Sequence, residues 1–151
     1  MFCGANSINL DSKGRIAIPA KYRPAIIESN RSNLTITCSP FDKCLLIFIE
    51  EQWESTKTQL NSLSDSRKEY RALKRIMLDL SDTVEMDTNG RLLIPAVLRE
   101  RINSSKELML IGQTNKFQLW NEIEWKQQTQ KDFELLSDSN LDPDELPELH
   151  F

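Results

Sequence analysis

Two short segments contain the residues of this chain with the clearest chemical potential. Asp11-Ser-Lys-Gly-Arg15 returns 76 positions later as Asp87-Thr-Asn-Gly-Arg91. An arginine guanidinium can bond O6 and N7 of guanine together, and a nearby carboxylate can hold it in the required orientation. Gly14 and Gly90 are typical turn residues, because glycine adopts positive φ without a steric penalty. The pattern therefore indicates two β-hairpin tips that could present basic side chains to DNA.

The predicted DNA-contacting residues are Lys13, Arg15 and Arg91, and the predicted hairpin-orienting residues are Asp11, Gly14, Asp87 and Gly90. A structural interpretation competes with this one. In each segment the aspartate and the arginine could simply fix the register of a hairpin, since opposite charges on facing strands attract. We favour DNA contact for Arg15 and the structural interpretation for Arg91, because Lys13 accompanies Arg15 whereas the neutral Asn89 accompanies Arg91. The first hairpin is accordingly the predicted principal contact surface.

Other kinds of chemistry find little support in the sequence. The only histidine is His150, next to the C-terminus, and no Ser/His/Asp or Cys/His arrangement can be built around it. The four glycines form no phosphate-binding loop, and the three cysteines contain no CxxC pair. Asp11 and Asp87 are better explained as turn carboxylates than as a catalytic pair. We expect no enzymatic activity, no cofactor, no metal site and no small-molecule substrate.

The net charge of −4 at pH 7 is unevenly distributed along the chain. Residues 138–151 contain five acidic side chains and no lysine or arginine, so the rest of the chain has a small positive charge. Residues 1–23 contain four basic side chains and one acidic side chain. Because the local charge decides whether a surface can approach phosphates, the negative total does not exclude DNA binding.

The two segments belong to a longer internal repeat. From Asp11 to Arg23 and from Asp87 to Arg99, seven of thirteen positions are identical. A second pair of similar stretches, 44–53 and 116–125, follows at an offset of 72. Two copies are too few for a solenoid, so the repeat predicts a pseudo-symmetric fold built from two related halves. We expect a first half at 1–54, a helical connector at 55–81, a second half at 82–136 and an acidic flexible tail at 137–151.

Each half is predicted to contain a hairpin, a short helix, two strands and a longer helix. Alternating polar and apolar residues and runs of β-forming residues predict the strands. Pro19 and Pro95 are expected at the first position of the short helices, where a missing N–H is tolerated. The basic residues of the connector helix are interpreted as a solvated face. The predicted elements are strands at 7–11, 15–18, 34–38, 45–49, 108–111 and 117–120 and helices at 20–27, 66–80 and 96–102.

The composition is that of a soluble globular protein. The chain has 151 residues, of which 39% are hydrophobic and 28% charged. No apolar run approaches the roughly 20 residues that a membrane-spanning helix needs, and the first residues lack the pattern of a secretory signal. We therefore expect a cytoplasmic protein with reduced thiols.

These motifs together resemble the MraZ family of bacterial transcriptional regulators. The resemblance covers residues 1 to about 136 and rests on the opening Met-Phe-x-Gly and on four further stretches. These are Leu10–Arg15, Pro19–Arg23, Asp87–Pro95 and Leu110–Trp120. The Asp-x-x-Gly-Arg unit alone belongs more widely to swapped-hairpin AbrB-like DNA-binding domains.

The resemblance implies an α+β fold of two tandem AbrB-like halves that interlock their hairpins into a small β-barrel flanked by helices. It also implies a homo-oligomeric ring at the nucleoid that binds G-rich direct repeats in double-stranded DNA, upstream of the division and cell-wall gene cluster. Asp11 and Arg15, Asp87 and Arg91 match the family's Asp-x-x-x-Arg signature, and Lys13 matches its basic turn residue. Cys3 stands where the family commonly has arginine, which removes a possible phosphate contact.

An alternative from another class is an oligomeric scaffold or antitoxin-like partner that binds protein instead of DNA. Such a protein would use apolar patches or the acidic tail. It would have no need of the positive charge in residues 1–23 or of the Lys13/Arg15 tip. That feature therefore discriminates the two hypotheses and favours a DNA-binding regulator.

Overall fold

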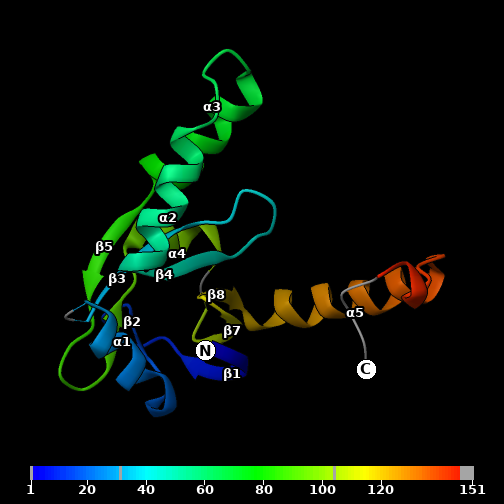
Figure 1. Cartoon of the computed structure of the whole chain (residues 1–151). Helices are drawn as coiled ribbons and strands as arrows, with labels where there is room; N and C mark the ends of the chain where they lie inside the picture. The colour runs from blue at the N-terminus through cyan, green and yellow to red at the C-terminus, as the bar shows by residue number, and fades with distance from the viewer. Residues whose placement is uncertain (1, 31, 104, 147–151) are drawn as a thin grey trace.

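The structure, a computed structural model, describes residues 2–30, 32–103 and 105–146. It is an α+β fold with one six-stranded antiparallel sheet, in the order β1-β7-β8-β4-β3-β5, and a two-stranded ribbon of β2 and β6 (Figure 1). His150 and the last part of the predicted tail, 147–151, lie outside the described residues. The elements are β1 (Phe2–Asn9), β2 (Arg15–Ala17), η1 (Ala20–Tyr22), α1 (Arg23–Asn30), β3 (Asn33–Cys38), β4 (Leu45–Ile49), α2 (Glu50–Asn61), α3 (Lys68–Lys74), η2 (Arg75–Asp79), β5 (Asp82–Glu85), β6 (Arg91–Leu93), α4 (Ala96–Arg101), β7 (Glu107–Thr114), β8 (Lys116–Asn121), α5 (Glu122–Asp138) and η3 (Pro143–Glu145).

The two halves of the repeat exchange their first strands. β1 of the first half pairs with β7 of the second, and β5 of the second half pairs with β3 of the first. In the middle of the sheet β4 pairs with β8, its counterpart in the repeat. The strand order therefore reads the same from either edge once each strand is replaced by its counterpart. The repeat seen in the sequence becomes a pseudo-twofold arrangement of interlocked halves.

The predicted hairpin of strands 7–11 and 15–18 is wrong in its pairing. The chain does reverse at the turn, but among the described residues the two strands share only one bridge, Leu10↔Ile16. β2 pairs instead with β6, with Arg15 opposite Leu93 and Ala17 opposite Arg91. β1 pairs along its whole length with β7, and its other edge meets the second strand only at that bridge. The β2–β6 ribbon thus takes one strand from each half.

Aromatic rings join the two halves in the core. Phe2 of β1 stacks on Phe117 of β8 with ring centroids 4.2 Å apart, and Tyr22 meets Phe117 edge-on at 5.1 Å. The Tyr22 hydroxyl donates a hydrogen bond of 2.6 Å to a main-chain carbonyl oxygen of β1. Ile16 and Leu92, on the inner face of the ribbon, are fully buried in the same cluster. Packing beneath the ribbon therefore fixes the position of its backbone.

Pro19 and Pro95 occupy the N-cap position, just before the helix, instead of the first helical position where they are expected. Pro19 and Pro95 precede their helices with ψ of 137° and 142°, and the helical turns begin at Ala20 and Ala96. The extended ψ carries the chain out of the ribbon before it can turn. Because φ values of −52° and −55° suit proline at either position, residue type alone does not distinguish them.

Two helical arms project from the body in different directions (Figure 1). The connector arm consists of α2, α3 and η2, and its base packs on the sheet through Trp53, whose ring lies 5.4 Å from that of Phe48. The helix predicted at 66–80 is α-helical only to Lys74 and then widens into the π-helical turn η2. There the buried Thr37 hydroxyl donates a hydrogen bond of 2.8 Å to the carbonyl oxygen of Met77. A side chain of the sheet thus takes part in satisfying the backbone of this turn.

The terminal arm is α5. Its start is fixed, because Asn121 Oδ1 accepts a hydrogen bond of 2.9 Å from the Ile123 N–H and Trp125 meets Trp120 edge-on at 5.8 Å. Its outer part is different: every residue from 130 to 142 is exposed. These include the large apolar side chains Phe133, Leu135, Leu136 and Leu141. No helix in the described ranges is both long and apolar enough to cross a membrane.

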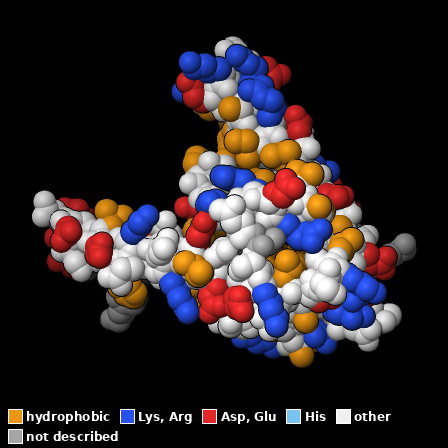
Figure 2. All heavy atoms as spheres, turned by 180° about the vertical axis from the view of Figure 1, so that it is seen from behind, with side chains coloured by type: hydrophobic (Ala, Val, Ile, Leu, Met, Phe, Trp, Pro, Cys, Tyr) orange, Lys and Arg blue, Asp and Glu red, His pale blue; other side chains and the backbone are white. Residues whose placement is uncertain are grey.

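The outer ends of the two arms differ in charge, as Figure 2 shows. Exposed or half-buried basic residues gather near the end of the connector arm, and exposed acidic residues gather along the outer part of the terminal arm and just beyond it. The basic set is Arg67, Lys68, Arg71, Lys74 and Arg75. The acidic set is Asp132, Glu134, Asp138, Asp142, Asp144 and Glu145.

The three thiols differ in environment, which gives a first prediction. Cys3 is exposed, whereas Cys38 and Cys44 are buried, and burial raises the pKa of Cys44 from 9.0 to about 12. A protonated, buried thiol is unreactive. We expect a thiol reagent at pH 8 to label one cysteine in the native protein and all three after denaturation.

Because the pKa of Cys44 is raised on folding, its contribution to stability is present below pH 9 and is lost as pH rises towards 12. Rapid labelling of Cys44 in the folded protein would contradict this packing.

Candidate nucleic-acid interface

The first Asp-x-x-Gly-Arg segment forms a tight turn organised by its aspartate. Asp11 Oδ1 accepts hydrogen bonds from the Lys13 N–H at 2.9 Å and the Arg15 N–H at 2.8 Å. Asp11 Oδ2 accepts a third, of 2.9 Å, from Arg15 Nε. Gly14, with φ of 80°, closes the turn by donating from its N–H to the Asp11 carbonyl oxygen at 3.0 Å. The turn therefore fixes the guanidinium by one edge and leaves the side chain of Lys13 exposed at its tip.

The second segment repeats this geometry bond for bond. Asp87 Oδ1 accepts hydrogen bonds from the N–H groups of Asn89 and Arg91, both at 2.9 Å, and Asp87 Oδ2 accepts one of 3.1 Å from Arg91 Nε. Gly90, with φ of 76°, donates to the Asp87 carbonyl oxygen at 3.0 Å. Arg91 is thus held as firmly as Arg15, and the sequence-based preference for the first turn has no counterpart in the local bonding.

These bonds keep both aspartates ionised. The N–H of Arg15 lowers the pKa of Asp11, with further lowering from the Arg15 side chain and the Lys13 N–H and only partial opposition from desolvation. The N–H of Arg91 does the same for Asp87. In the described residues, no group bonds the terminal Nη atoms of Arg15 or Arg91. Each guanidinium therefore keeps its outer nitrogens available for an external acceptor.

Each turn is covered by an arginine from the other half. A Cβ added to Gly14 would lie 2.6 Å from Cζ of Arg99, and one added to Gly90 would lie 2.7 Å from Cδ of Arg23. The Arg23 Nε also donates a hydrogen bond of 2.8 Å to the Ile18 carbonyl oxygen. Sequence reasoning did not select Arg23 and Arg99, although their identity in both copies was the available signal. Their contacts cross between the halves, so no local pattern predicts them.

This packing predicts a specific loss of stability in Gly14→Ala. The substitution places a side chain at positive φ and against the Arg99 guanidinium, and we expect a loss of about 1–3 kcal/mol in the free energy of unfolding. Gly4→Ala is a matched control, because Gly4 also has positive φ, of 107°, but its nearest neighbour would lie 3.8 Å away. In urea titrations Gly14→Ala should unfold earlier than Gly4→Ala. Adding Arg99→Ala should restore part of the difference, and no restoration would contradict the contact.

The β2–β6 ribbon brings the two arginines to one surface. Ile16 and Leu92 point into the core, so alternation places Arg15, Ala17, Arg91 and Leu93 on the opposite side, which we call the ribbon face. Arg15 and Arg91 occupy diagonal positions in the register, about 7–8 Å apart by strand geometry. The expected site residues therefore meet, but on a ribbon shared by both halves instead of on two separate hairpin tips.

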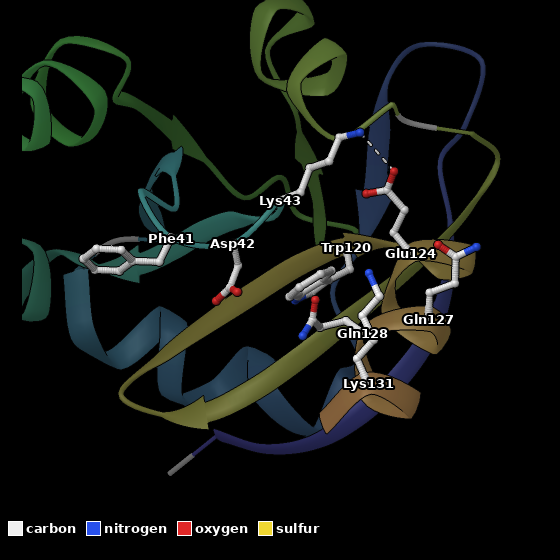
Figure 3. A pocket seen from close by; sticks show the side chains of 8 residues that line it. All are labelled: Phe41, Asp42, Lys43, Trp120, Glu124, Gln127, Gln128 and Lys131. Carbon is white, nitrogen blue, oxygen red and sulfur yellow. Dashed lines mark hydrogen bonds and ion pairs between the residues drawn. The ribbon is translucent and has the colours of Figure 1, made fainter. Parts of the chain in front are cut away.

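A separate hollow of about 290 Å³ lies between the β3–β4 loop and the base of the terminal arm (Figure 3). Lys43 Nζ and Glu124 Oε1 form an ion pair of 3.0 Å beside it, while Phe41 is 86% exposed and points away. Within the described ranges, no three His, Cys, Asp or Glu residues are grouped to hold a metal ion. The open, largely polar lining differs from the enclosed, mostly apolar pockets that hold small ligands. Its lining residues are Phe41, Asp42, Lys43, Trp120, Glu124, Gln127, Gln128 and Lys131.

Comparison with known proteins gives one consistent result. Residues 1–76 and 77–143 each match the family described as "MraZ protein", a description that also likens it to antitoxins. The chain is 46% identical over 135 residues to a protein of Histophilus somni (strain 129Pt) named transcriptional regulator MraZ, covering 89% of each chain. It is 43% identical over 141 residues to the protein of that name from Shewanella amazonensis, covering 93% of each. The two matches begin at residues 1 and 77, which are 76 positions apart, the same offset as that between the Asp11–Arg15 and Asp87–Arg91 segments.

Proposed function

This chain belongs to the MraZ family, and on that premise we propose that it is a DNA-binding transcriptional regulator that acts as a homo-oligomer. The observation that carries the proposal is the ribbon face. It presents two arginines, each fixed by an aspartate through Nε and each with its terminal nitrogens unbonded among the described residues. We assign DNA contact to Lys13, Arg15 and Arg91, and positioning of these side chains to Asp11, Gly14, Asp87 and Gly90.

The dimensions of DNA support this assignment. The major groove is about 12 Å wide and admits a two-stranded ribbon, and an arginine fork reads guanine there. Because the aspartates hold the guanidinium groups before DNA arrives, little side-chain freedom remains to be lost on binding. We propose that the sheet and the ribbon together form the small barrel implied by the resemblance, since β2 lies against β1 and β6 against β5. Such a barrel is a rigid support for the reading face.

The arms support assembly with a second copy. The outer part of α5 is exposed on all sides, and an unsupported helix of this length is only marginally stable in water. Its apolar residues Phe133 and Leu136 share one side, and the same stretch of helix contains Asp132, Glu134 and Asp138. The outer end of the connector arm offers complementary basic side chains, including Arg67, Lys68 and Arg71. We therefore propose that the terminal arm of one copy docks on the connector arm of the next.

Docking of one arm on a different arm is a heterologous contact, which closes into a ring when the rotation allows it. Every subunit of such a ring presents the same ribbon face. Directly repeated sites suit this geometry, and we propose that the protein reads G-rich direct repeats upstream of the division and cell-wall gene cluster. Several contacts to one DNA then reinforce each other through effective concentration.

The deciding experiment is fluorescence anisotropy of the protein with DNA from upstream of its own gene and with a shuffled control of equal length, at several salt concentrations. Preference for the native fragment that persists as salt rises is the expected result, because base contacts survive where counterion release fades. Equal binding that disappears with salt, or no binding, would overturn the proposal. The oligomeric protein-binding or antitoxin-like alternative would then be the next to test.

A further inference from the structure

The ribbon face is symmetric in its arginines but not in its other two residues. Arg15 and Arg91 are counterparts in the repeat, with the same bonds to their aspartates. Ala17 and Leu93 are also counterparts, yet one is a methyl group and the other a large apolar side chain that is 48% exposed. The ribbon face therefore departs from the pseudo-twofold symmetry that relates the two halves.

Leu93 is an unusual residue for this position. It lies directly opposite Arg15 in the strand register and two residues after Arg91 on its own strand. About half of the leucine is exposed beside these arginine positions, while the neighbouring Leu92 and Ile94 fill the core beneath it. It does place an apolar group where the face would meet the edges of base pairs.

The chemistry of the major groove leaves one match for such a side chain. The base edges there present hydrogen-bond donors and acceptors, and the one apolar group is the C5-methyl of thymine. Residues directly opposite on paired strands have Cβ atoms about 5 Å apart. Successive nucleotides along one strand are about 3.4 Å apart. A guanine bonded by Arg15 would therefore have its neighbour one or two steps away under Leu93.

We propose that Leu93 is a specificity residue that contacts a thymine methyl group beside the guanine read by Arg15, and that this contact gives the ribbon face a direction on DNA. The proposal rests on the proposed function, because it needs the ribbon face to meet DNA. With the shorter Ala17 at the equivalent position, the other half buries less apolar surface against a methyl group, so its contact is weaker. A single orientation on the duplex follows, which suits a site without a palindrome.

The experiment removes the methyl group from the DNA and the leucine from the protein, separately and together. Anisotropy is measured with the upstream fragment containing thymine and with the same fragment containing deoxyuridine throughout. Wild-type protein should bind the deoxyuridine fragment at least about fourfold more weakly, the effect of losing one buried methyl group. Leu93→Ala should lose most of this difference, because the two changes remove largely the same contact. Leu93→Gln preserves the length of the side chain but replaces its apolar end. It should also lose the difference between the two fragments, which would show that the loss in Leu93→Ala is not a general effect of shortening the side chain.

The matched control is Val97→Ala. Val97 is 66% exposed and lies on α4, off the ribbon face, so its variant should keep the full difference between thymine and deoxyuridine. If Leu93→Ala also keeps the wild-type difference, the proposal is overturned. It is equally overturned if wild-type protein prefers the native fragment over the shuffled one but binds thymine and deoxyuridine alike, in which case the proposed function stands. Absence of any preference for the native fragment would remove the proposed function and this inference with it.

Discussion

Arg15→Ala protein is expected to bind the native upstream fragment no more tightly than shuffled DNA, while its circular dichroism spectrum remains that of the wild type. In the part of the chain that the structure describes, the Arg15 side chain is bonded only to Asp11, at the surface, so its removal leaves the buried face of the ribbon intact. A good arginine–guanine contact is worth about 1–3 kcal/mol of discrimination, or roughly 5- to 150-fold in affinity. Several subunits on one DNA multiply that loss. Anisotropy with both fragments measures it.

Two companion variants make this result specific. Arg91→Ala should weaken specific binding in the same way, because Arg91 has the same bonds and lies on the same face. Lys126→Ala removes an equal charge from an exposed side chain of the terminal arm and should change specific binding little. Should Arg15→Ala unfold the protein or leave its sequence preference unchanged, the Asp11–Arg15 pair is structural and the assignment of the site is wrong.

Replacing Phe133 and Leu136 together by serine is expected to reduce the assembly to small species and to lower affinity for a fragment with several repeats. Phe133 is 71% exposed and Leu136 59%, so their loss removes no internal packing and leaves the fold intact. The same side chains, docked on another copy, would contribute most of the apolar burial. Once subunits separate, the gain from effective concentration, about 10²–10⁴, is lost. Sedimentation velocity reports the mass and anisotropy reports the affinity.

The control for this variant lies on the same helix. Gln130→Ser with Lys131→Ser changes two exposed positions of the terminal arm that are not apolar, and its mass should equal that of the wild type. An unchanged mass for the Phe133/Leu136 variant would mean that the terminal arm is not the contact between copies. A smaller mass with unchanged affinity would show that assembly and DNA binding are independent.

The sequence predicts the strands and turns within each half better than the pairing of strands between the halves. β4 spans the predicted 45–49, and β3 extends the predicted 34–38 by one residue, because 34–38 and 45–49 are runs of β-forming residues that are buried throughout. The tight turns at Gly14 and Gly90 also follow from local chemistry, since glycine adopts their positive φ without a steric penalty. Such features depend on neighbours in the chain, and a single sequence contains that information.

The pairing of β1 is the clearest failure. Alternation in 7–11 indicates a strand but not its partner, and the residues before it, Cys3-Gly-Ala-Asn6, have no apolar alternation that would reveal the rest of β1. What extends the strand is β7, which lies far along the chain and approaches so closely that Gly112 has no room for a Cβ beside Cys3. The covering of Gly14 by Arg99 is of the same kind. Both depend on the exchange of strands between halves, which the resemblance implies but local patterns do not.

That exchange also determines when the protein can fold. During synthesis β1 leaves the ribosome long before β7, its only ladder partner among the described strands, and Phe2 has no Phe117 to stack on until β8 has followed. The first half therefore cannot complete its sheet as a nascent chain, and its unpaired strand edges stay exposed to other chains in the meantime. Pairing across so long a separation is also slow. The six-stranded sheet can thus be completed only when translation is nearly finished, although the adjacent strands β3 and β4 can pair earlier.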